Sequence, residues 1–402
     1  MNEPDRSIAA GERRLRREQR RRQVKRRRLT AMAVLGAILF VTIAALASGG
    51  GPDVFERAVA DTVEERRNRP VRLTVEANGD LLIHSQIYTR ALALGGGRRY
   101  DFQPMLREIQ PWVEQADLAL CHVETPMTSA PPAGYPVFNT PPDLARSIKA
   151  VGWDACSTAS NHTLDKGAEG IDETLGALDR AGVRHYGSAR SAAEADRPTI
   201  VDVKGMKVGL LAYTEMTNGI PVPDRWSVNL AEAPRILADA RRAREAGARV
   251  VIVNLHWGEE FQQEPSAAQL RLARTLARSD DITAIVGQHI HAAQPIKRVE
   301  GKIVVFGEGN LISAQTAACC PAASQDGFLA LLDLVVVPGK ASVERVRYVP
   351  VYVRNPDYTV LPVGEALERG EGPAAELRES YKRTVSVVGR GPGIEPVPAR
   401  LP

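Results

Sequence analysis

The chain has 402 residues, of which 44% are hydrophobic, 25% charged and 5% aromatic. This composition is typical of a globular protein and excludes a collagen-like or wholly disordered chain. The net charge of +4 is unevenly distributed, because residues 1–28 contain twelve Lys or Arg and only four Asp or Glu. The rest of the chain therefore carries a net charge of −4, a mildly acidic balance that argues against binding to nucleic acid.

A segment without charges follows this basic tail. Residues 29–48 are twenty uncharged, mostly apolar residues, and a helix of that length spans about 30 Å, the thickness of a bilayer's hydrocarbon core. Because clusters of Lys and Arg stay on the cytoplasmic side, we expect a single-pass anchor in the cell membrane, with the tail (1–28) inside and the main domain outside. A cleavable signal peptide is the alternative, since Ala45-Leu46-Ala47 fits a cleavage site. Residues 49–70 are predicted to form a linker and a charged stalk.

The main part of the chain alternates short apolar runs with amphipathic stretches. This alternation predicts an α/β fold with helices on the faces of a largely parallel sheet. After Gly327, two long apolar runs suggest an antiparallel pair of strands. We find no domain boundary inside 71–361 and predict one domain there. Residues 362–402 are predicted to be a C-terminal extension, with an end rich in Pro and Gly that is disordered.

Polar side chains gather where the predicted strands end. Five such ends carry residue types that commonly bind metals, and six of the seven histidines lie at them. In chain order these residues are Asp80 and His84, His122 and Glu124, Asn161, His162 and Asp165, His256 and Glu259, and His289 and His291. Because sites in open α/β sheets form at the carboxyl ends of strands, we expect these side chains to meet in one site.

The residue types indicate a metal centre. Histidine nitrogens together with Asp, Glu and Asn oxygens suit Mn²⁺, Zn²⁺ or Fe²⁺ better than Ca²⁺, which prefers oxygen alone. His289 and His291 are two residues apart, so on a strand both side chains would face the same centre. Each motif taken alone also has a structural explanation: Asn161-His162 fits a turn, and Glu259 fits a charge at the start of a helix. Together they predict one or two divalent metal ions.

The order of these motifs resembles that of the CapA family, the capsule and poly-gamma-glutamate biosynthesis proteins, within the calcineurin-like metallophosphoesterase superfamily. The resemblance extends from about Leu73 to Leu311. It rests on Gly79-Asp80, Glu124-Thr125-Pro126, Ser160-Asn161-His162, His256-Trp257-Gly258-Glu259, Gly287-Gln288-His289-Ile290-His291 and Gly307-Glu308-Gly309-Asn310. It implies a four-layer α/β/β/α sandwich with a metal site at one edge of the sheets.

The resemblance also implies roles for individual residues. The implied metal ligands are Asp80, Glu124, Asn161, His256, His289 and His291. His162 matches the histidine that protonates the leaving group, and Asp165 lies three residues further on, where it could orient His162. The residues expected at the site without an assigned role are His84, Glu259 and Asn310. The chain departs from the superfamily pattern at two places: His84 follows Asp80 by four residues instead of two, and Glu124 stands where a bridging aspartate is usual.

Two functions are compatible with these residues. In the first, the protein is a membrane-anchored, metal-dependent hydrolase of ester, phosphoester or amide bonds, with His162 as general acid. In the second, it is a non-catalytic component of a complex that synthesises or exports an anionic polymer, which it binds. The complete set of predicted ligands together with His162 favours the hydrolase.

The four cysteines allow one disulfide bond to be predicted. Cys121 and Cys156 lie near the ends of two strands that the fold of the CapA family would place side by side. In an oxidising compartment they either form a disulfide bond or remain two buried thiols. For the adjacent Cys319 and Cys320 the sequence leaves the redox state open.

Overall fold

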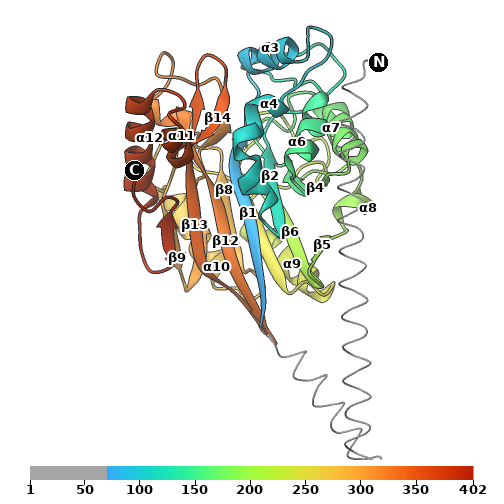
Figure 1. The fold of residues 1–402 in the computed structure, drawn as a ribbon. Helices are drawn as coiled ribbons and strands as arrows, with labels where there is room; N and C mark the ends of the chain where they lie inside the picture. The colour runs from blue at the N-terminus through green and yellow to red at the C-terminus, as the bar shows by residue number, and fades with distance from the viewer. Residues whose placement is uncertain (1–69, 402) are drawn as a thin grey trace, which may run out of the picture. The chain divides into compact units, whose positions relative to one another are not determined.

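A computed structural model describes residues 70–401 of the chain. These residues form two β-sheets with helices packed around them (Figure 1). The predicted basic tail, membrane segment and stalk lie before Pro70, outside the described residues. Among residues 70–401, no helix combines the length and the apolar character that crossing a bilayer requires.

The first sheet combines parallel and antiparallel strands. Its order is β14 (Thr359–Pro362), β13 (Lys340–Arg354), β12 (Asp326–Val337), β1 (Val71–Leu81), β2 (Leu118–Val123), β3 (Ala155–Ser157) and β4 (Arg184–Tyr186). Strands β1 to β4 are parallel to one another, whereas β12 is antiparallel to both β1 and β13. Two short strands, β11 (Asn310–Ile312) and β15 (Ile394–Pro396), pair with β1 and β13. The antiparallel pair predicted after Gly327 is therefore confirmed.

The second sheet is mainly parallel. Its order is β5 (Thr199–Val203), β6 (Met206–Thr214), β7 (Val250–His256), β8 (Ala284–Gln288), β10 (Lys302–Val305) and β9 (Ile296–Val299). Strands β6, β7, β8 and β10 run parallel, and the two outer strands, β5 and β9, are antiparallel to their neighbours. The β5–β6 hairpin turns at Lys204 and Gly205, which both have positive φ, as the Lys-Gly pair predicts.

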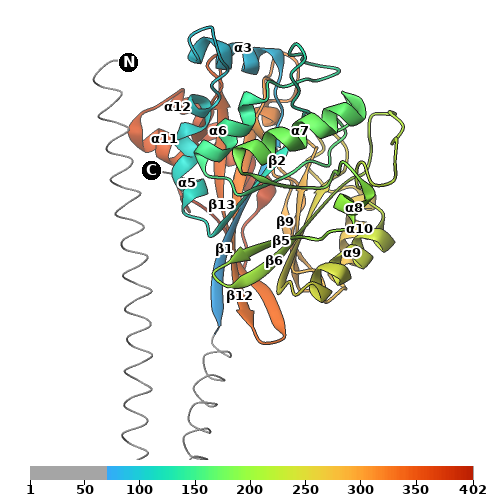
Figure 2. The same cartoon turned by 90° about the vertical axis from the view of Figure 1, so that its right-hand side faces the viewer.

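Helices cover the outer face of each sheet, so that the layers stack as helix, sheet, sheet and helix (Figure 2). The helices packed on the outer face of the first sheet are α3 (Ser85–Leu94), α4 (Gln103–Leu106), α5 (Gln110–Glu114), α6 (Asp143–Val151) and α7 (Gly167–Ala181). Helices α11 (Val363–Arg369) and α12 (Ala374–Val388) pack on the other face of β13 and β14, through Tyr352 and Leu361. Helices α9 (Ala233–Glu245) and α10 (Ala267–Ala277) cover the second sheet. The short helix α8 (Ala192–Ala195) precedes β5. This is the expected α/β/β/α sandwich.

The largest apolar cluster lies between the two sheets. It takes alternate residues from β1, such as Leu73, Val75 and Ala77, and combines them with Ile252 of β7 and Val286 of β8. Successive residues of a strand point to opposite faces, so each strand supplies every second side chain to this core. The other residues of these strands face the helices. Burial on both faces explains why the strands are continuous apolar runs in the sequence.

The chain does not end its fold at Leu361, so the predicted domain end and the disordered terminus are wrong. Helices α11 and α12 follow directly, and buried residues of α12 such as Leu377 pack on Tyr352 of β13. Strand β15 then adds to the edge of β13. A Pro- and Gly-rich segment indicates a loop when only the sequence is considered. In the folded protein, the edge of β13 offers hydrogen bonds to the backbone of this segment, so part of it forms a strand.

A disulfide bond joins the neighbouring strands β2 and β3. Cys121 and Cys156 are directly opposite each other in the parallel register, and their sulfur atoms are bonded. Both side chains face the helix-covered side of the sheet. The next residues along the strands, His122 and Ser157, therefore point toward the second sheet. The bond thus fixes the register of two strands directly beside these two residues.

Thiol counting tests this bond. The unfolded protein should expose two thiols per chain without reductant, from Cys319 and Cys320, and four after reduction. Replacing both Cys121 and Cys156 with Ala should destabilise the fold by about 3 kcal/mol, because the 35-residue separation leaves a loop that the bond no longer closes. The matched control, Ala at both Cys319 and Cys320, should leave the melting temperature unchanged. Four thiols without reductant would contradict the bond.

Candidate metal centre

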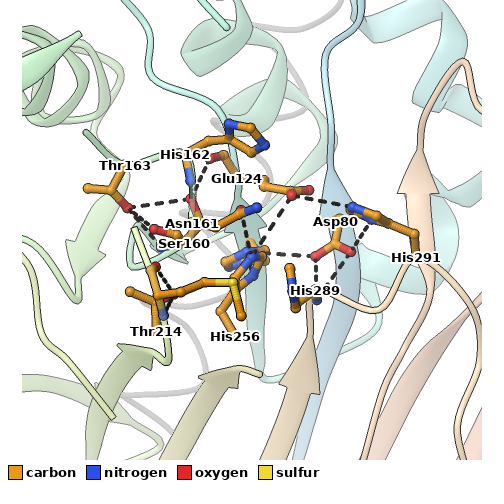
Figure 3. Close-up of polar contacts among 12 residues, drawn as sticks. Asp80, Glu124, Ser160, Asn161, His162, Thr163, Thr214, His256, His289 and His291 are labelled. Atoms are coloured by element: carbon orange, nitrogen blue, oxygen red, sulfur yellow. Dashed lines mark hydrogen bonds and ion pairs between the residues drawn. The ribbon is translucent and has the colours of Figure 1, made fainter. Parts of the chain in front are cut away.

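The side chains between the sheets change from apolar to polar toward the carboxyl ends of the strands. In β7, Ile252 belongs to the core between the sheets, and Asn254 and His256 follow on the same face. In β2, Leu120 is followed in the same way by His122. The parallel strands of both sheets end on the same side of the sandwich, so polar residues such as His122 and His256 converge there. Figure 3 shows His256 among Asp80, Asn161 and His289. Strand direction and alternation together build the site.

Asp80, His122 and His256 form a first group of potential ligands. All three are buried, and one ligand atom of each lies within 4.8 Å of the others. Nε2 of His122 lies 2.9 Å from Nδ1 of His256 and 3.7 Å from Oδ1 of Asp80. Its other nitrogen, Nδ1, is 2.6 Å from the hydroxyl of Ser157. Because a hydroxyl can donate or accept, Ser157 can hold this ring in place while Nε2 faces a cation.

Glu124, His289 and His291 form a second group. All three are buried, and one ligand atom of each lies within 4.8 Å of the others. Oε1 of Glu124 lies 3.7 Å from Nε2 of His291 and 4.0 Å from Nε2 of His256. Within residues 70–401, neither carboxylate oxygen of Glu124 has a hydrogen-bond partner, and neither does Nδ1 of His289. Buried polar atoms without partners are costly. A divalent cation would satisfy all three, so the donor set fits the expected metal.

His291 connects the two groups. Its Nδ1 lies 3.1 Å from Oδ2 of Asp80 and 3.0 Å from Oδ1 of Asn310. Both partners are acceptors, so Nδ1 carries a proton and Nε2 is the atom that faces Glu124. The amide of Asn310 donates to the carbonyl of Ser324 at 2.8 Å, which fixes its orientation. Asn310 is therefore at the site, as expected, and positions His291.

Burial and neighbouring charges shift the pKa values of these groups. Burial lowers the pKa of His122 to about 4 and that of His289 to about 3, and it also lowers the pKa of His256. These rings are neutral near pH 7, which is the form that binds metal. Burial, with the nearby charge of Asp80, raises the pKa of Glu124.

His291 differs from the other three rings. Burial lowers its pKa, but the carboxylates of Glu124 and Asp80 outweigh that effect and raise it to about 9. His291 affects Asp80 in turn. Burial raises the pKa of Asp80, but the hydrogen bond with His291 and the charge of His291 lower it below its usual value. The positive charge of His291 thus offsets two buried carboxylates, a role that a metal ion would take over.

His289 and His291 lie on the loop just after β8, which ends at Gln288, rather than on the strand itself. Both have positive φ values, 96° and 54°, in a backbone region that residues other than glycine rarely adopt. Ile290 between them is fully buried. A tight left-handed loop, anchored by Ile290, therefore turns both rings toward the site, and such backbone strain is typical of functional positions.

Asn161, His162 and Asp165 occupy the loop after β3. Oδ1 of Asn161 accepts a hydrogen bond from Nε2 of His256 at 2.9 Å, so this predicted ligand is within the cluster. His162 lies beside it, at the edge of the cluster in Figure 3. Nδ1 of His162 is 2.8 Å from Oδ2 of Asp165. The expected pairing of these two residues is present.

Two of the expected site residues lie outside both ligand groups. His84 is at the edge of the site: its Nδ1 is 3.3 Å from the carbonyl of Leu82, and its ring packs edge-on against Phe138, which also packs against His162. Glu259 is exposed and accepts a hydrogen bond from Gln262. The neighbouring Glu260 is exposed as well, and its charge is among the smaller effects that raise the pKa values of Glu124 and His291.

His122 is the ligand that sequence reasoning did not assign. The sequence places it at a strand end, but the resemblance to the CapA family implies no role for it. The signal that could have found it is the inward position it shares with Leu118 and Leu120 in β2. Ser157, its hydrogen-bond partner, gave no signal, because only the pairing of β2 with β3 brings the two together.

Removal of single ligands tests the centre. His122→Ala and His289→Ala should each weaken Mn²⁺ or Zn²⁺ binding by about 100-fold, because each removes a nitrogen from a buried group. His84→Ala is the matched control and should bind metal like the unchanged protein. Elemental analysis after equilibrium dialysis gives the metal content. Full occupancy in His122→Ala would remove this residue from the ligand set.

Comparisons with known proteins agree with this site. Residues 74–315 match the family model of the bacterial capsule synthesis protein PGA_cap, which is more than half of the chain. The capsule biosynthesis protein CapA of Bacillus anthracis is 24% identical over 265 residues, which cover 63% of this chain and 62% of that protein. The PGA biosynthesis protein CapA of Bacillus subtilis is 26% identical over 181 residues, covering 44% and 47%. The matches thus span less than two thirds of either relative.

Among solved structures, the calcineurin-like phosphoesterase YfkN from Bacillus subtilis has a TM-score of 0.47 and 17% identity, covering 78% of this chain and 100% of that one. The family assignment rests on the sequence match, which contains every predicted ligand from Asp80 to His291. The chain belongs to the bacterial capsule synthesis protein family PGA_cap.

Proposed function

We propose that this protein is a metal-dependent hydrolase of ester, phosphoester or amide bonds that works in the synthesis of a capsule or of poly-gamma-glutamate. The observation that carries the proposal is the His162–Asp165 pair beside two groups of buried ligands. A residue set that only held a metal would not need an oriented histidine at its edge. The calcineurin-like character of the fold is consistent with this chemistry and is part of the proposal.

The potential ligands fall into two groups, and each group would hold one ion. Asp80, His122 and His256 would hold one ion, and Glu124, His289 and His291 a second, with Asn161 within reach of the first group. Bound ions would act as Lewis acids that polarise the scissile group and activate a water. The chain's own contribution is to keep these side chains buried and fixed, since each ligand is at most 3% exposed.

The proton chemistry belongs to His162. The carboxylate of Asp165 can only accept at 2.8 Å, so Nδ1 of His162 carries a proton and Nε2 is the atom that gives a proton to the leaving group. Asp165 also accepts from the backbone N–H of Phe138 at 2.7 Å, which fixes the carboxylate. Asp165 thus orients the ring, as it was expected to do.

The alternative is a non-catalytic component that binds an anionic polymer, and the names of the relatives favour it. The charges around the site argue against this alternative. Burial has the largest effect on the pKa values of Asp80, Glu124 and His291; the charges that follow it come from imidazoles and carboxylates of the described chain, with no Lys or Arg among them. A surface that grips a polyanion needs such cations, so we place the hydrolase first.

His162→Ala tests the assigned role. Turnover should fall by about 10²–10⁴-fold, the usual contribution of a positioned general acid, while metal content stays unchanged because His162 lies outside both ligand groups. Asp165→Asn should lower turnover less, by loosening the ring. The measurement is hydrolysis of a panel of phosphodiesters, aryl esters and gamma-glutamyl polymers by the Mn²⁺-loaded protein. If the protein hydrolyses one of them and His162→Ala retains full activity, His162 is not the acid.

The membrane anchor is a further part of the proposal. Twelve cations before an uncharged twenty-residue segment support a single pass with the main domain outside the cytoplasm. The Cys121–Cys156 bond supports the same side, since disulfides persist in oxidising compartments.

Protease accessibility tests this topology. Protease added to intact cells should digest the main domain and leave an N-terminal fragment of the size of the tail and anchor. The control is the same treatment after lysis, which should also remove the tail. A main domain protected until lysis would contradict the orientation.

A further inference from the structure

Exposed hydrophobic side chains in the described part of the chain occur on two loops. The large ones are Tyr135, which is 79% exposed, Val137 at 47% and Met216 at 39%. Single exposed hydrophobic residues are common and need no explanation. These three differ because each of their loops contains a residue that contacts His162, the proposed general acid.

The first loop joins β2 to α6 and is held rigidly. Ala133 and Asn139 exchange two backbone hydrogen bonds of 3.0 and 2.9 Å, so residues 134–138 form its tip. Phe138 is buried and packs edge-on against the ring of His162, with 4.6 Å between centroids. The ring of Tyr135 packs in the same way on Phe138 at 6.4 Å. A chain of aromatic rings thus leads from His162 to the exposed Tyr135.

The second loop follows β6. Its Glu215 N–H donates to the carbonyl of His256 at 3.0 Å, and Thr214 Oγ1 donates to the carbonyl of Met216 at 2.8 Å. Two residues further on, Nδ2 of Asn218 lies 3.4 Å from Nδ1 of His162. Met216 therefore lies between a residue that bonds the backbone of His256 and a residue that contacts His162.

We infer that Tyr135, Val137 and Met216 bind the leaving group of the substrate, and that this group is apolar or carries a ring. The inference rests on the proposed hydrolysis. A general acid must lie against the leaving atom, so whatever is attached to that atom extends past His162 and over the loops that contact it. The charged part of the substrate would lie on the other side, at the metal ligands.

Tyr135, Val137 and Met216 form what we call the rim, and its chemistry favours an apolar leaving group over an anionic one. Burying part of an aromatic and two aliphatic side chains favours binding of an apolar group. Asp165, which contacts His162, is a carboxylate, and its charge and that of Glu260 both raise the pKa of Glu124. Carboxylates repel an anionic leaving group, such as the acidic end of a polyglutamate chain. The rim therefore selects an aryl or lipid-like alcohol.

Two phosphonates test the inference without relying on turnover. Phenylphosphonate and methylphosphonate offer the metals the same charged group, and only the first carries a ring. The full-length, Mn²⁺-loaded protein should bind phenylphosphonate more tightly by calorimetry. In the double variant Tyr135→Ser with Met216→Ser, the Kd of phenylphosphonate should rise about tenfold, whereas the Kd of methylphosphonate and the metal content should stay within twofold of the original. Tyr135→Phe, which keeps the ring, should bind like the unchanged protein.

The possible failures are distinguishable. If the protein hydrolyses a substrate but the double variant binds both phosphonates as before, or loses both equally, the inference is wrong and the hydrolase proposal stands. If the double variant instead loses binding to phosphatidylglycerol vesicles and keeps its preference for phenylphosphonate, the rim contacts the bilayer and the inference is again wrong. If the metal-loaded protein neither binds a phosphonate nor hydrolyses any member of the panel, both proposals fall.

Discussion

Two carboxylates buried side by side are the constraint on which the rest of this structure depends. Asp80 and Glu124 are each at most 1% exposed, and Glu124 has no hydrogen-bond donor of its own. Carboxylates in such a position are costly unless positive charge compensates them. Around them the fold assembles four imidazoles, of which three are neutral through burial and one, His291, is charged through its contact with both carboxylates. A divalent ion is the simplest compensation.

Much of the local architecture serves to hold this cluster in place. The Cys121–Cys156 bond lies on the opposite face of the strands from His122 and Ser157 and fixes their register. Asn310 holds His291 through a hydrogen bond, and the left-handed backbone at His289 and His291 is retained by the buried Ile290 between them. The cost of this strain is a few kcal/mol at most. It is offset by the large core between the two sheets.

The site has two sides with different chemistry. On one side are the ligand groups, where the charged part of a substrate would bind. On the other is His162, oriented by Asp165 and flanked by two loops that expose apolar side chains. The family name points to polymer synthesis in the capsule, yet neither the rim nor the charges near the ligands resemble a surface for a polyanion. The hydrolysis that we propose, of an intermediate with an apolar or ring-bearing leaving group, would reconcile the family with the geometry.

The sequence by itself determined the alternation of strands and helices, the positions of Asp80, Glu124, Asn161, His256, His289 and His291, and the pairing of His162 with Asp165, because these depend on local patterns of polarity and spacing. Only the tertiary structure decided that His122 joins a group of potential metal ligands and that the C-terminal segment is folded. A residue's direction at a strand end depends on which face is inward and on how the next loop turns. Both are set by long-range pairing of strands, such as β2 with β3 and β13 with β15, which spacing along the chain does not encode.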